Sequence, residues 1–255
     1  MSGILYLVPS PIGNLKEVSP RTKEILSSVD FVACEDTRNT SKLLNLLNIS
    51  KQCVSCHEHN EVSSSSKIIE ALLNGENVAY LSDAGYPCIS DPGYLLVKEA
   101  IKNEIQIVPL SGPNALLNGL VGSGIDTSHF LFYGFLNSKK SLREKELTEL
   151  KNLPFTLIFY EAPHRINETL ESMLNVLGNR PVCIARELTK KFEEFIRSDL
   201  KTLVEEKREY IGELVLIVDK NLDVKSDVSY LDQFNKLVKE GYSVKDAINI
   251  LSIIF

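Results

Sequence analysis

A predicted strand and the loop that follows it read Val78-Ala-Tyr-Leu-Ser-Asp-Ala-Gly-Tyr-Pro-Cys-Ile-Ser-Asp-Pro-Gly93. The residues up to Leu81 are uncharged and of strand length, whereas the glycines and prolines after them forbid regular structure. Loops from strand to helix usually have about two to six residues, and this one has about twelve. Ligands of open α/β sheets lie at the carboxyl ends of the strands. A ligand site at this loop is therefore the first hypothesis, with an unusually long connection as the alternative.

The composition is that of an ordinary globular protein. The 255 residues are 44% hydrophobic and 24% charged, which suits one large domain or two smaller ones. No apolar run approaches the ~20 residues that span a bilayer and no signal peptide is recognisable, so we expect a cytoplasmic protein. The five scattered cysteines are expected to be thiols. Because the net charge is −6, an RNA partner would need a local basic surface.

The first predicted strand, Ile4-Leu-Tyr-Leu-Val8, ends in the loop Pro9-Ser-Pro-Ile-Gly-Asn14. A dinucleotide-binding protein has its glycine fingerprint at this place. Pro9 and Pro11 have no backbone N–H, so this loop lacks two of the donors that a phosphate cradle needs. The loop is better suited to a ligand without phosphates.

Polar residues of both charges follow the second predicted strand, Phe31-Val-Ala-Cys34. Glu35, Asp36 and Arg38 fall at the same edge of the sheet as the central loop, which favours a functional role. The alternative is a capping turn in which Asp36 pairs with Arg38. Thr40 is predicted to be the N-cap of the helix that follows.

Two thiols and two imidazoles lie within the sequence Cys53-Val-Ser-Cys-His-Glu-His-Asn60. A structural zinc site normally joins two separated ligand pairs, whereas side chains along one extended segment point to opposite faces. We therefore expect no metal. His57, Glu58, His59 and Asn60 are predicted to be polar groups at the end of a third strand, and substrate contact and solvent exposure are both open for each of them.

Strands and helices alternate along the rest of the chain, which predicts an α/β fold in two halves. Ser63 to Ser66 is expected to be a loop before a helix, and Tyr210 to Val218 a closing strand. We predict an N-terminal α/β domain at 1–112, a C-terminal α/β domain at 113–220, and a linker with a short helical tail at 221–255. One predicted helix is basic, and either a solvated face or RNA contact would explain Lys139, Lys140, Arg143 and Lys145.

Six motifs between about Leu5 and Val218 resemble those of one family, in unbroken order. They are Val8-Pro-Ser-Pro-Ile-Gly-Asn, Glu35-Asp-Thr-Arg, His57-Glu-His-Asn, Ser82-Asp-Ala-Gly-Tyr-Pro-Cys-Ile-Ser-Asp-Pro-Gly, Tyr160-Glu-Ala-Pro-His-Arg and Ala185-Arg-Glu-Leu-Thr-Lys. The chain is similar to the RsmI-type 16S rRNA (cytidine-2′-O)-methyltransferases. The resemblance implies the tetrapyrrole methylase fold, two α/β domains with S-adenosylmethionine in the cleft between them, as a homodimer that acts on ribosomal RNA or the small ribosomal subunit.

The resemblance also implies the site residues. It assigns the cofactor to Ile12, Tyr86, Cys88, Ile89, Pro113, Asn114, Ala115, Tyr160, Ala185 and Gly212. Two of these motifs depart from the family pattern, because Tyr86-Pro-Cys88 stands where Thr-Pro-Gly is usual and Ser111-Gly-Pro-Asn114 where Pro-Gly-Pro-Ser is usual.

A ribose hydroxyl is a poor nucleophile, so its methylation needs a base or a cation that stabilises the forming alkoxide. The base candidates are Asp36, Glu58 and His59, and the cation candidates are Arg38, Arg165, Arg186 and Lys190. Lys190 could act as a base only if burial lowered its pKa. The residues expected to position the RNA are Arg38, Asn60, His164, Arg165, Arg186, Lys139 and Lys140.

Three other functions are compatible with parts of the pattern. A methyltransferase of the same fold could act on porphyrinoid carbons or on a modified histidine of a translation factor, as in diphthine synthesis. Glu35 and Asp36 after the second strand would fit a nicotinamide ribose in an oxidoreductase, although the glycines of that fingerprint are missing at 9 and 11. Tyr86 and Cys88 could instead mark the lost cofactor site of an RNA-binding module.

Overall fold

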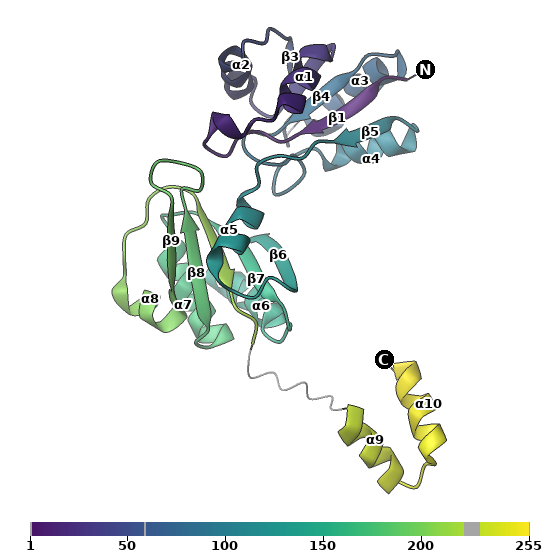
Figure 1. Ribbon diagram of the computed structural model, residues 1–255, viewed down its shortest axis with the longest axis vertical. Coiled ribbons are helices and arrows are strands. Elements are labelled where there is room, and N and C mark those ends of the chain that lie inside the picture. Colours follow the sequence, from purple (N-terminus) through teal and green to yellow (C-terminus); the bar gives the residue numbers. More distant parts are fainter. Residues whose placement is uncertain (1, 59, 222–229, 255) are drawn as a thin grey trace.

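The computed structural model describes residues 2–58, 60–221 and 230–254, and within them the chain forms two sheets that lie one above the other along the long axis (Figure 1). The first sheet is built from the N-terminal half and the second from the C-terminal half. Helices cover both sheets, as expected for the α/β class.

The first sheet has five parallel strands in the order β3-β2-β4-β1-β5. Its strands are β1 Ile4–Val8, β2 Phe31–Cys34, β3 Cys53–Ser55, β4 Val78–Leu81 and β5 Gln106–Pro109. The helices between them are η1 Leu15–Glu17, α1 Pro20–Ser28, α2 Thr37–Leu46, α3 Glu61–Leu73 and α4 Tyr94–Lys102. Every residue of β4 is buried, because a central parallel strand has helices on both faces.

The register of this sheet brings its functional loops together. Val8 pairs with Leu81, and Leu81 pairs with Cys34, so β1, β4 and β2 end side by side. The loops that leave these three ends carry the proline-rich, central and Glu35-Asp36 motifs. The predicted meeting of these motifs at one sheet edge is confirmed.

The second sheet is mixed and has the order β6-β7-β10-β8-β9. Its strands are β6 Phe130–Phe135, β7 Thr156–Glu161, β8 Pro181–Arg186, β9 Glu194–Asp199 and β10 Leu214–Val218. The helices of this half are α5 Ala115–Ser123, α6 Lys140–Leu150, α7 Ile166–Leu177 and α8 Leu200–Glu206. The register of β6 shifts at Gly134, where the backbone has a positive φ of 86°.

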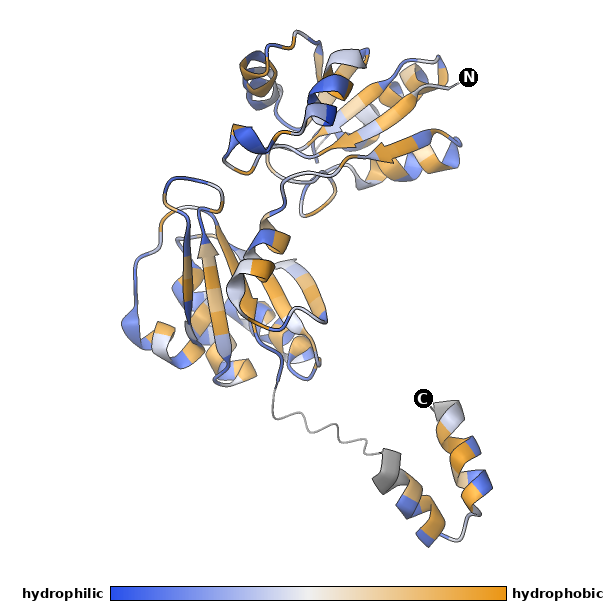
Figure 2. Ribbon diagram, viewed as in Figure 1, coloured by the Kyte–Doolittle hydropathy of each residue, from blue (hydrophilic) through white to orange (hydrophobic). Residues whose placement is uncertain are grey.

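Apolar side chains fill both faces of each sheet, and Figure 2 shows the strands as largely hydrophobic. One core cluster joins the two halves. Ile12, from the loop after β1, belongs to the same buried cluster as Leu188, Val215 and Ile217 of the second half. A residue of the proline-rich loop is thus part of the second core.

Three local predictions were wrong. Thr40 lies inside α2, and the N-cap is Asp36, whose side chain accepts a hydrogen bond from the N–H of Arg38. The serines 63–66 belong to α3, because Glu61 rather than a residue after them begins this helix. The last strand begins at Leu214 and leaves residues 210–213 free to form a loop.

The proposed boundary at 112/113 stays a prediction, although α5 contacts β7, β8, β9 and β10 of the second sheet. Of the predicted linker and tail at 221–255, residues 222–229 and 255 lie outside the described residues. Between them, α9 Tyr230–Lys239 and α10 Val244–Ile254 pack against each other, which agrees with the expected helical tail.

Candidate functional site

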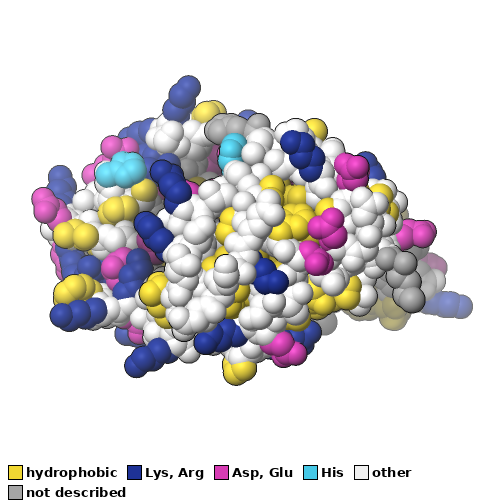
Figure 3. Space-filling view, turned by 90° about the horizontal axis from the view of Figure 1, so that it is seen from above, with side chains coloured by type: hydrophobic (Ala, Val, Ile, Leu, Met, Phe, Trp, Pro, Cys, Tyr) yellow, Lys and Arg dark blue, Asp and Glu magenta, His cyan; other side chains and the backbone are white. Residues whose placement is uncertain are grey.

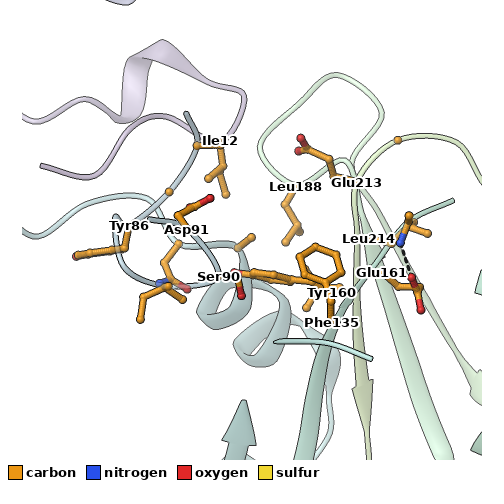
Figure 4. Close-up of a pocket in the computed structure, with 18 of the residues that line it drawn as sticks. Ile12, Tyr86, Ser90, Asp91, Phe135, Tyr160, Glu161, Leu188, Glu213 and Leu214 are labelled. Carbon is orange, nitrogen blue, oxygen red and sulfur yellow. Dashed lines mark hydrogen bonds between the residues drawn. The ribbon is translucent and has the colours of Figure 1, made fainter. Parts of the chain in front are cut away.

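A cavity of about 380 Å³ lies between the two sheets. Its wall comes from the loops after β1 and β4, the start of α5, the ends of β6 and β7, and the loops before β9 and β10. Figure 4 shows Ile12, Asp91, Leu188, Tyr160 and Phe135 around this space. The lining residues are Ile12, Ala84, Gly85, Tyr86, Ile89, Ser90, Asp91, Asn114, Ala115, Phe135, Tyr160, Glu161, Ala162, Pro163, Leu188, Gly212, Glu213, Leu214 and Val215. The volume suits a ligand of cofactor size.

The proline-rich loop and the central loop are joined to each other by backbone. Ser10 and Gly85 exchange both N–H···O hydrogen bonds, at 2.8 and 2.9 Å. The hydroxyl of Ser10 donates to the carbonyl of Ser82 at 2.7 Å. Since Pro9 and Pro11 have no N–H and that of Ser10 is used here, residues 9–11 offer no amide to a phosphate.

The central loop has an uncommon backbone that buried contacts hold in place. Cys88 and Ser90 have positive φ angles of 70° and 60°, which cost free energy for residues other than glycine. The carboxylate of Glu61 accepts hydrogen bonds from the N–H groups of Gly93 and Leu95 at 3.0 and 2.9 Å, so α3 caps the first turn of α4. A rigid scaffold therefore fixes the loop that carries Ser90 and Asp91.

Tyr86 ties this loop to the segment that crosses between the halves. Its hydroxyl accepts a hydrogen bond from the N–H of Gly112 at 2.8 Å. Figure 4 shows its side chain directed away from Tyr160, so the bulk of Tyr86 does not fill the cavity. The substitution of tyrosine for the usual threonine adds a link between loop and crossing segment.

Asp91 is a half-buried carboxylate in the cavity wall. Burial, and to a smaller extent the nearby carboxylates of Glu35 and Asp83, raise the pKa of Asp91 to about 7. Within the described residues the Asp91 carboxylate has no hydrogen-bonded or ion-paired partner. The sequence reading did not single it out.

Seven of the ten residues assigned to the cofactor line this one cavity, namely Ile12, Tyr86, Ile89, Asn114, Ala115, Tyr160 and Gly212. The other three do not line it. Ala185 is buried behind the wall in the core of β8, Pro113 is buried, and the Cys88 thiol lies towards Gly93. Their assignment to the cofactor stays a prediction.

The acidic corner after β2 has the pairing that the capping alternative predicted. Arg38 donates two hydrogen bonds to the carboxylate of Asp36, and these bonds lower the pKa of Asp36 to about 2. Burial raises the pKa of Glu35, as does the nearby carboxylate of Asp83. A carboxyl with a pKa near 2 is a weak base, so the geometry does not favour Asp36 among the base candidates.

Lys190 lies in the loop between β8 and β9, against Gly13 of the proline-rich loop. Its ammonium bridges Glu187 and Glu213 at 2.8 and 3.0 Å. Burial acts to lower the pKa of Lys190, but hydrogen bonds to both carboxylates outweigh it and raise the pKa. A raised pKa keeps Lys190 a cation at neutral pH, which disfavours it as a base and is compatible with its other predicted role, that of a cation near the acceptor.

The other predicted cations near the cavity have protein partners. The guanidinium of Arg165 binds the buried carboxylate of Glu161, which also accepts from the Thr169 hydroxyl at 2.6 Å. Arg186 donates to Glu194 at 2.9 Å. His164 is exposed on the loop before α7.

The basic helix α6 is only partly a basic surface. Lys139 and Lys140 are exposed. Arg143 is 1% exposed and donates to the Ser172 hydroxyl and the Ser138 carbonyl, both at 3.0 Å, so this residue is structural. Lysine and arginine side chains are scattered over the face in Figure 3 rather than gathered into one patch.

The third strand's end has a local hydrogen-bond network. The side chain of Asn60 accepts from the N–H of His57 at 2.8 Å and donates to the Ser55 carbonyl, so its amide closes the turn. Glu58 is exposed, and His59 lies outside the described residues. Among the described residues no group of His, Cys, Asp and Glu is arranged to hold a metal ion.

Sequence reasoning missed the wall residues that are contributed by packing between the halves, above all Ser90, Asp91, Phe135, Leu188 and Val215. Asp91 could have been found, because it lies in the central loop two residues before Gly93. Phe135 and Val215 lie in strands whose pattern indicates only core, so no signal in the sequence marked them.

Residues 4–204 match the model of the tetrapyrrole (corrin/porphyrin) methylases, a span that covers most of both sheets and most of the cavity wall. The chain belongs to the tetrapyrrole methylase family. It is 50% identical over 219 residues to the ribosomal RNA small subunit methyltransferase I of Bacillus subtilis, an alignment that covers 85% of this chain and 75% of the relative. It is 39% identical over 258 residues to the protein of the same name from Streptococcus pyogenes serotype M18, with 98% and 90% covered.

The crystal structure of a diphthine synthase has the same fold, with a TM-score of 0.66, 13% identity, and coverage of 86% of this chain and 91% of that one. As a member of this methylase family, the chain is a methyltransferase, which removes the oxidoreductase alternative. No helix in the described part of the chain is long and apolar enough to cross a membrane.

Proposed function

We propose that the protein transfers the methyl group of S-adenosylmethionine to the 2′-hydroxyl of a cytidine in the RNA of the small ribosomal subunit. The observation that carries this proposal is the identity of 39 to 50%, over 85 to 98% of the chain, to relatives named ribosomal RNA small subunit methyltransferase I. A uroporphyrin methyltransferase, the methyltransferase CobJ and a diphthine synthase share the fold, but these three structures are only 13 to 16% identical to the chain. The protein acts in the cytoplasm as a homodimer in this proposal.

The cavity fits S-adenosylmethionine by its chemistry. This donor is a sulfonium cation without phosphates, and it supplies an electrophilic methyl group when bound. Residues 9–11 of the proline-rich loop offer no free amide to a phosphate, and the wall is mainly apolar, with Tyr160 and Phe135 at 5.6 Å between ring centroids. Ile12, Leu188 and Val215 would enclose the apolar parts of the donor, and the carboxylate of Asp91 is a counter-charge for its cation.

The residues around the cavity hold reactants in place rather than form a bond to them. Methyl transfer is an in-line displacement, so much of the acceleration comes from alignment of the acceptor oxygen. Lys190 is suited to stabilise a forming alkoxide or to contact a phosphate, because it is a cation next to Glu213 of the cavity wall. Arg38, which is 84% exposed on its side chain, is suited to an RNA phosphate.

Lys139, Lys140 and His164 complete the proposed RNA contacts as exposed groups of the second half. Arg165, Arg186 and Asn60 support this surface in the proposal, since each already has a protein partner. Because the cationic side chains are scattered on the face seen in Figure 3, RNA of defined shape rather than any polyanion is the expected substrate for that face.

The test is an assay of the purified protein with labelled S-adenosylmethionine and three acceptors. These are small ribosomal subunits from cells that lack the protein, a corrinoid precursor, and the translation factor that carries the modified histidine. We expect label only in the ribosomal RNA, and mapping of resistant phosphodiester bonds should place it on one cytidine ribose. Label in either of the other acceptors, or on a base, would overturn the proposal.

A further inference from the structure

The cavity wall contains three carboxylates, and two of them are neutralised by a cation of the protein. Glu161 is bound by Arg165, and Glu213 by Lys190. The third is Asp91, whose carboxylate forms no ion pair with a cationic side chain in the described part of the chain. The titratable groups that face it are Glu35 and Asp83 from the neighbouring loops, Cys88 from its own loop and Tyr160 from β7. None of these supplies a positive charge.

A half-buried carboxylate surrounded by acidic groups is unfavourable unless something positive lies against it. The backbone is held in place on both sides of Asp91. Before it, Cys88 and Ser90 have positive φ angles, and after it, the carboxylate of Glu61 accepts a hydrogen bond from the N–H of Gly93. On the second half, a side chain placed at Gly134 would lie 3.3 Å from the Ser90 hydroxyl, so the loop is also in contact with β6. The protein therefore holds an uncompensated negative charge at the wall of its ligand cavity.

We propose that Asp91 is the specificity residue that distinguishes the cationic methyl donor from the neutral thioether product. This inference rests on the proposed function and deepens it. Before transfer the sulfonium is positive and attracts the carboxylate. In the reaction the acceptor hydroxyl gives up its proton to solvent and its oxygen forms a bond to the methyl carbon. The bond from carbon to sulfur breaks and its electron pair stays on sulfur, so the product's sulfur has no charge. The attraction is lost at that moment, which favours release of S-adenosylhomocysteine over retention.

In this role the Asp91 carboxyl should lose a proton when the donor binds, which a purely structural role would not require. A cation beside Asp91 favours its charged form and so lowers its pKa, which is about 7 without ligand. Near pH 7 the binding of S-adenosylmethionine should therefore release a fraction of a proton, whereas the binding of S-adenosylhomocysteine should release much less. For the same reason affinity for the donor should rise from about pH 6 to about pH 8, and affinity for the product should stay nearly level.

The experiment is isothermal titration of the full-length protein with each of the two ligands, at several pH values and in two buffers with different ionisation enthalpies. For Asp91→Asn we expect affinity for S-adenosylmethionine to fall by about tenfold, which corresponds to about 1.4 kcal/mol, and affinity for S-adenosylhomocysteine to change by less than about twofold. Proton release on binding of the donor should disappear. Asp91→Glu keeps the charge and should retain most of the preference.

Glu213→Gln is the matched comparison, because Glu213 lines the same cavity but is paired with Lys190. It should change the ratio of the two affinities by much less than Asp91→Asn does. The inference would be overturned if Asp91→Asn lowered the affinities for both ligands equally or left their ratio unchanged. It would also be overturned if Glu213→Gln changed that ratio as much as Asp91→Asn does. Binding of S-adenosylhomocysteine reports whether a variant is folded, and failure of the unsubstituted protein to bind either ligand would instead refute the proposed function.

Discussion

Replacement of Arg143 by alanine should destabilise the protein and leave RNA recognition to other residues. The Arg143 guanidinium is 1% exposed and donates hydrogen bonds at 3.0 Å to the Ser172 hydroxyl and to the Ser138 carbonyl, with a longer one of 3.4 Å to the Glu168 carbonyl. A hydrogen bond from a charged donor contributes about 1.5 kcal/mol or more, so loss of the two short bonds costs about 3 kcal/mol. The cost arises because acceptors between α6 and α7 are left unpaired.

Thermal and urea unfolding, followed by circular dichroism, measure this effect. For a chain of this size about 3 kcal/mol corresponds to a fall in Tm of roughly 6 to 12 °C. Lys140→Ala is the matched control on the same helix, because Lys140 is 65% exposed and its pair with Glu144 is 3.9 Å long, so its stability should change by less than about 0.5 kcal/mol. A loss of less than about 1 kcal/mol in Arg143→Ala, or a weaker salt dependence of RNA binding at unchanged stability, would refute the structural role.

Three further predictions concern the central loop. Gly93→Ala should lower the free energy of unfolding by more than about 2 kcal/mol, because φ is 123° and the new Cβ would lie 2.4 Å from Cε1 of Tyr80. The control is Gly178→Ala, where φ is 81° and nothing lies within 4 Å of the new Cβ. In the same urea unfolding experiment it should lower the free energy of unfolding by only about 1 kcal/mol. Asp91→Asn should be more stable than the unsubstituted protein at pH 8 by about 1 to 2 kcal/mol after allowance for solvent screening, and equal to it near pH 4. The sign follows because the folded-state pKa of Asp91, about 7, lies above its ordinary value. As the pH rises the carboxyl ionises first in the unfolded chain, so the unsubstituted protein loses stability between about pH 4 and pH 7. A stability difference between the two proteins that does not vary with pH would contradict this prediction. Tyr86→Phe removes the acceptor of the Gly112 N–H and should lower the free energy of unfolding by about 1 kcal/mol, whereas an unchanged urea midpoint would show that water replaces the hydroxyl.

The sequence was sufficient for the α/β class and for most strands, because hydrophobic runs such as Val78–Leu81 and Leu214–Val218 are bounded by glycine, proline or charged residues. Helix starts were harder to predict. Thr40 has the chemistry of an N-cap, but Asp36 lies at the strand end and caps the helix one turn earlier. Four serines read as a loop, yet the apolar residues after them extend the helix back to Glu61.

The site was predictable where a motif carries its own chemistry. The loops containing Ile12, Tyr86 and Asn114 could be placed at strand ends and therefore at one cavity. Arg143 was grouped with the exposed basic residues of its helix because of its charge, but its side chain is buried. The sequence does not reveal that this one basic residue of the helix points inwards between α6 and α7. The partners of Lys190 and Arg165 were not predictable either, since Glu213 and Glu161 become their neighbours only through tertiary contacts.

The position of Ile12 in the second core makes completion of the pocket depend on translation of β10. Ile12 is synthesised well before Val215 and Ile217, which belong to the same buried cluster and to the last strand of the second sheet. A nascent chain that stops before β10 can pair the strands of the first sheet, yet it lacks Leu214 and Val215 of the cavity wall and the central strand of the second sheet. Truncated products should thus be unable to sequester the methyl donor, and only chains read through to the last strand compete for it.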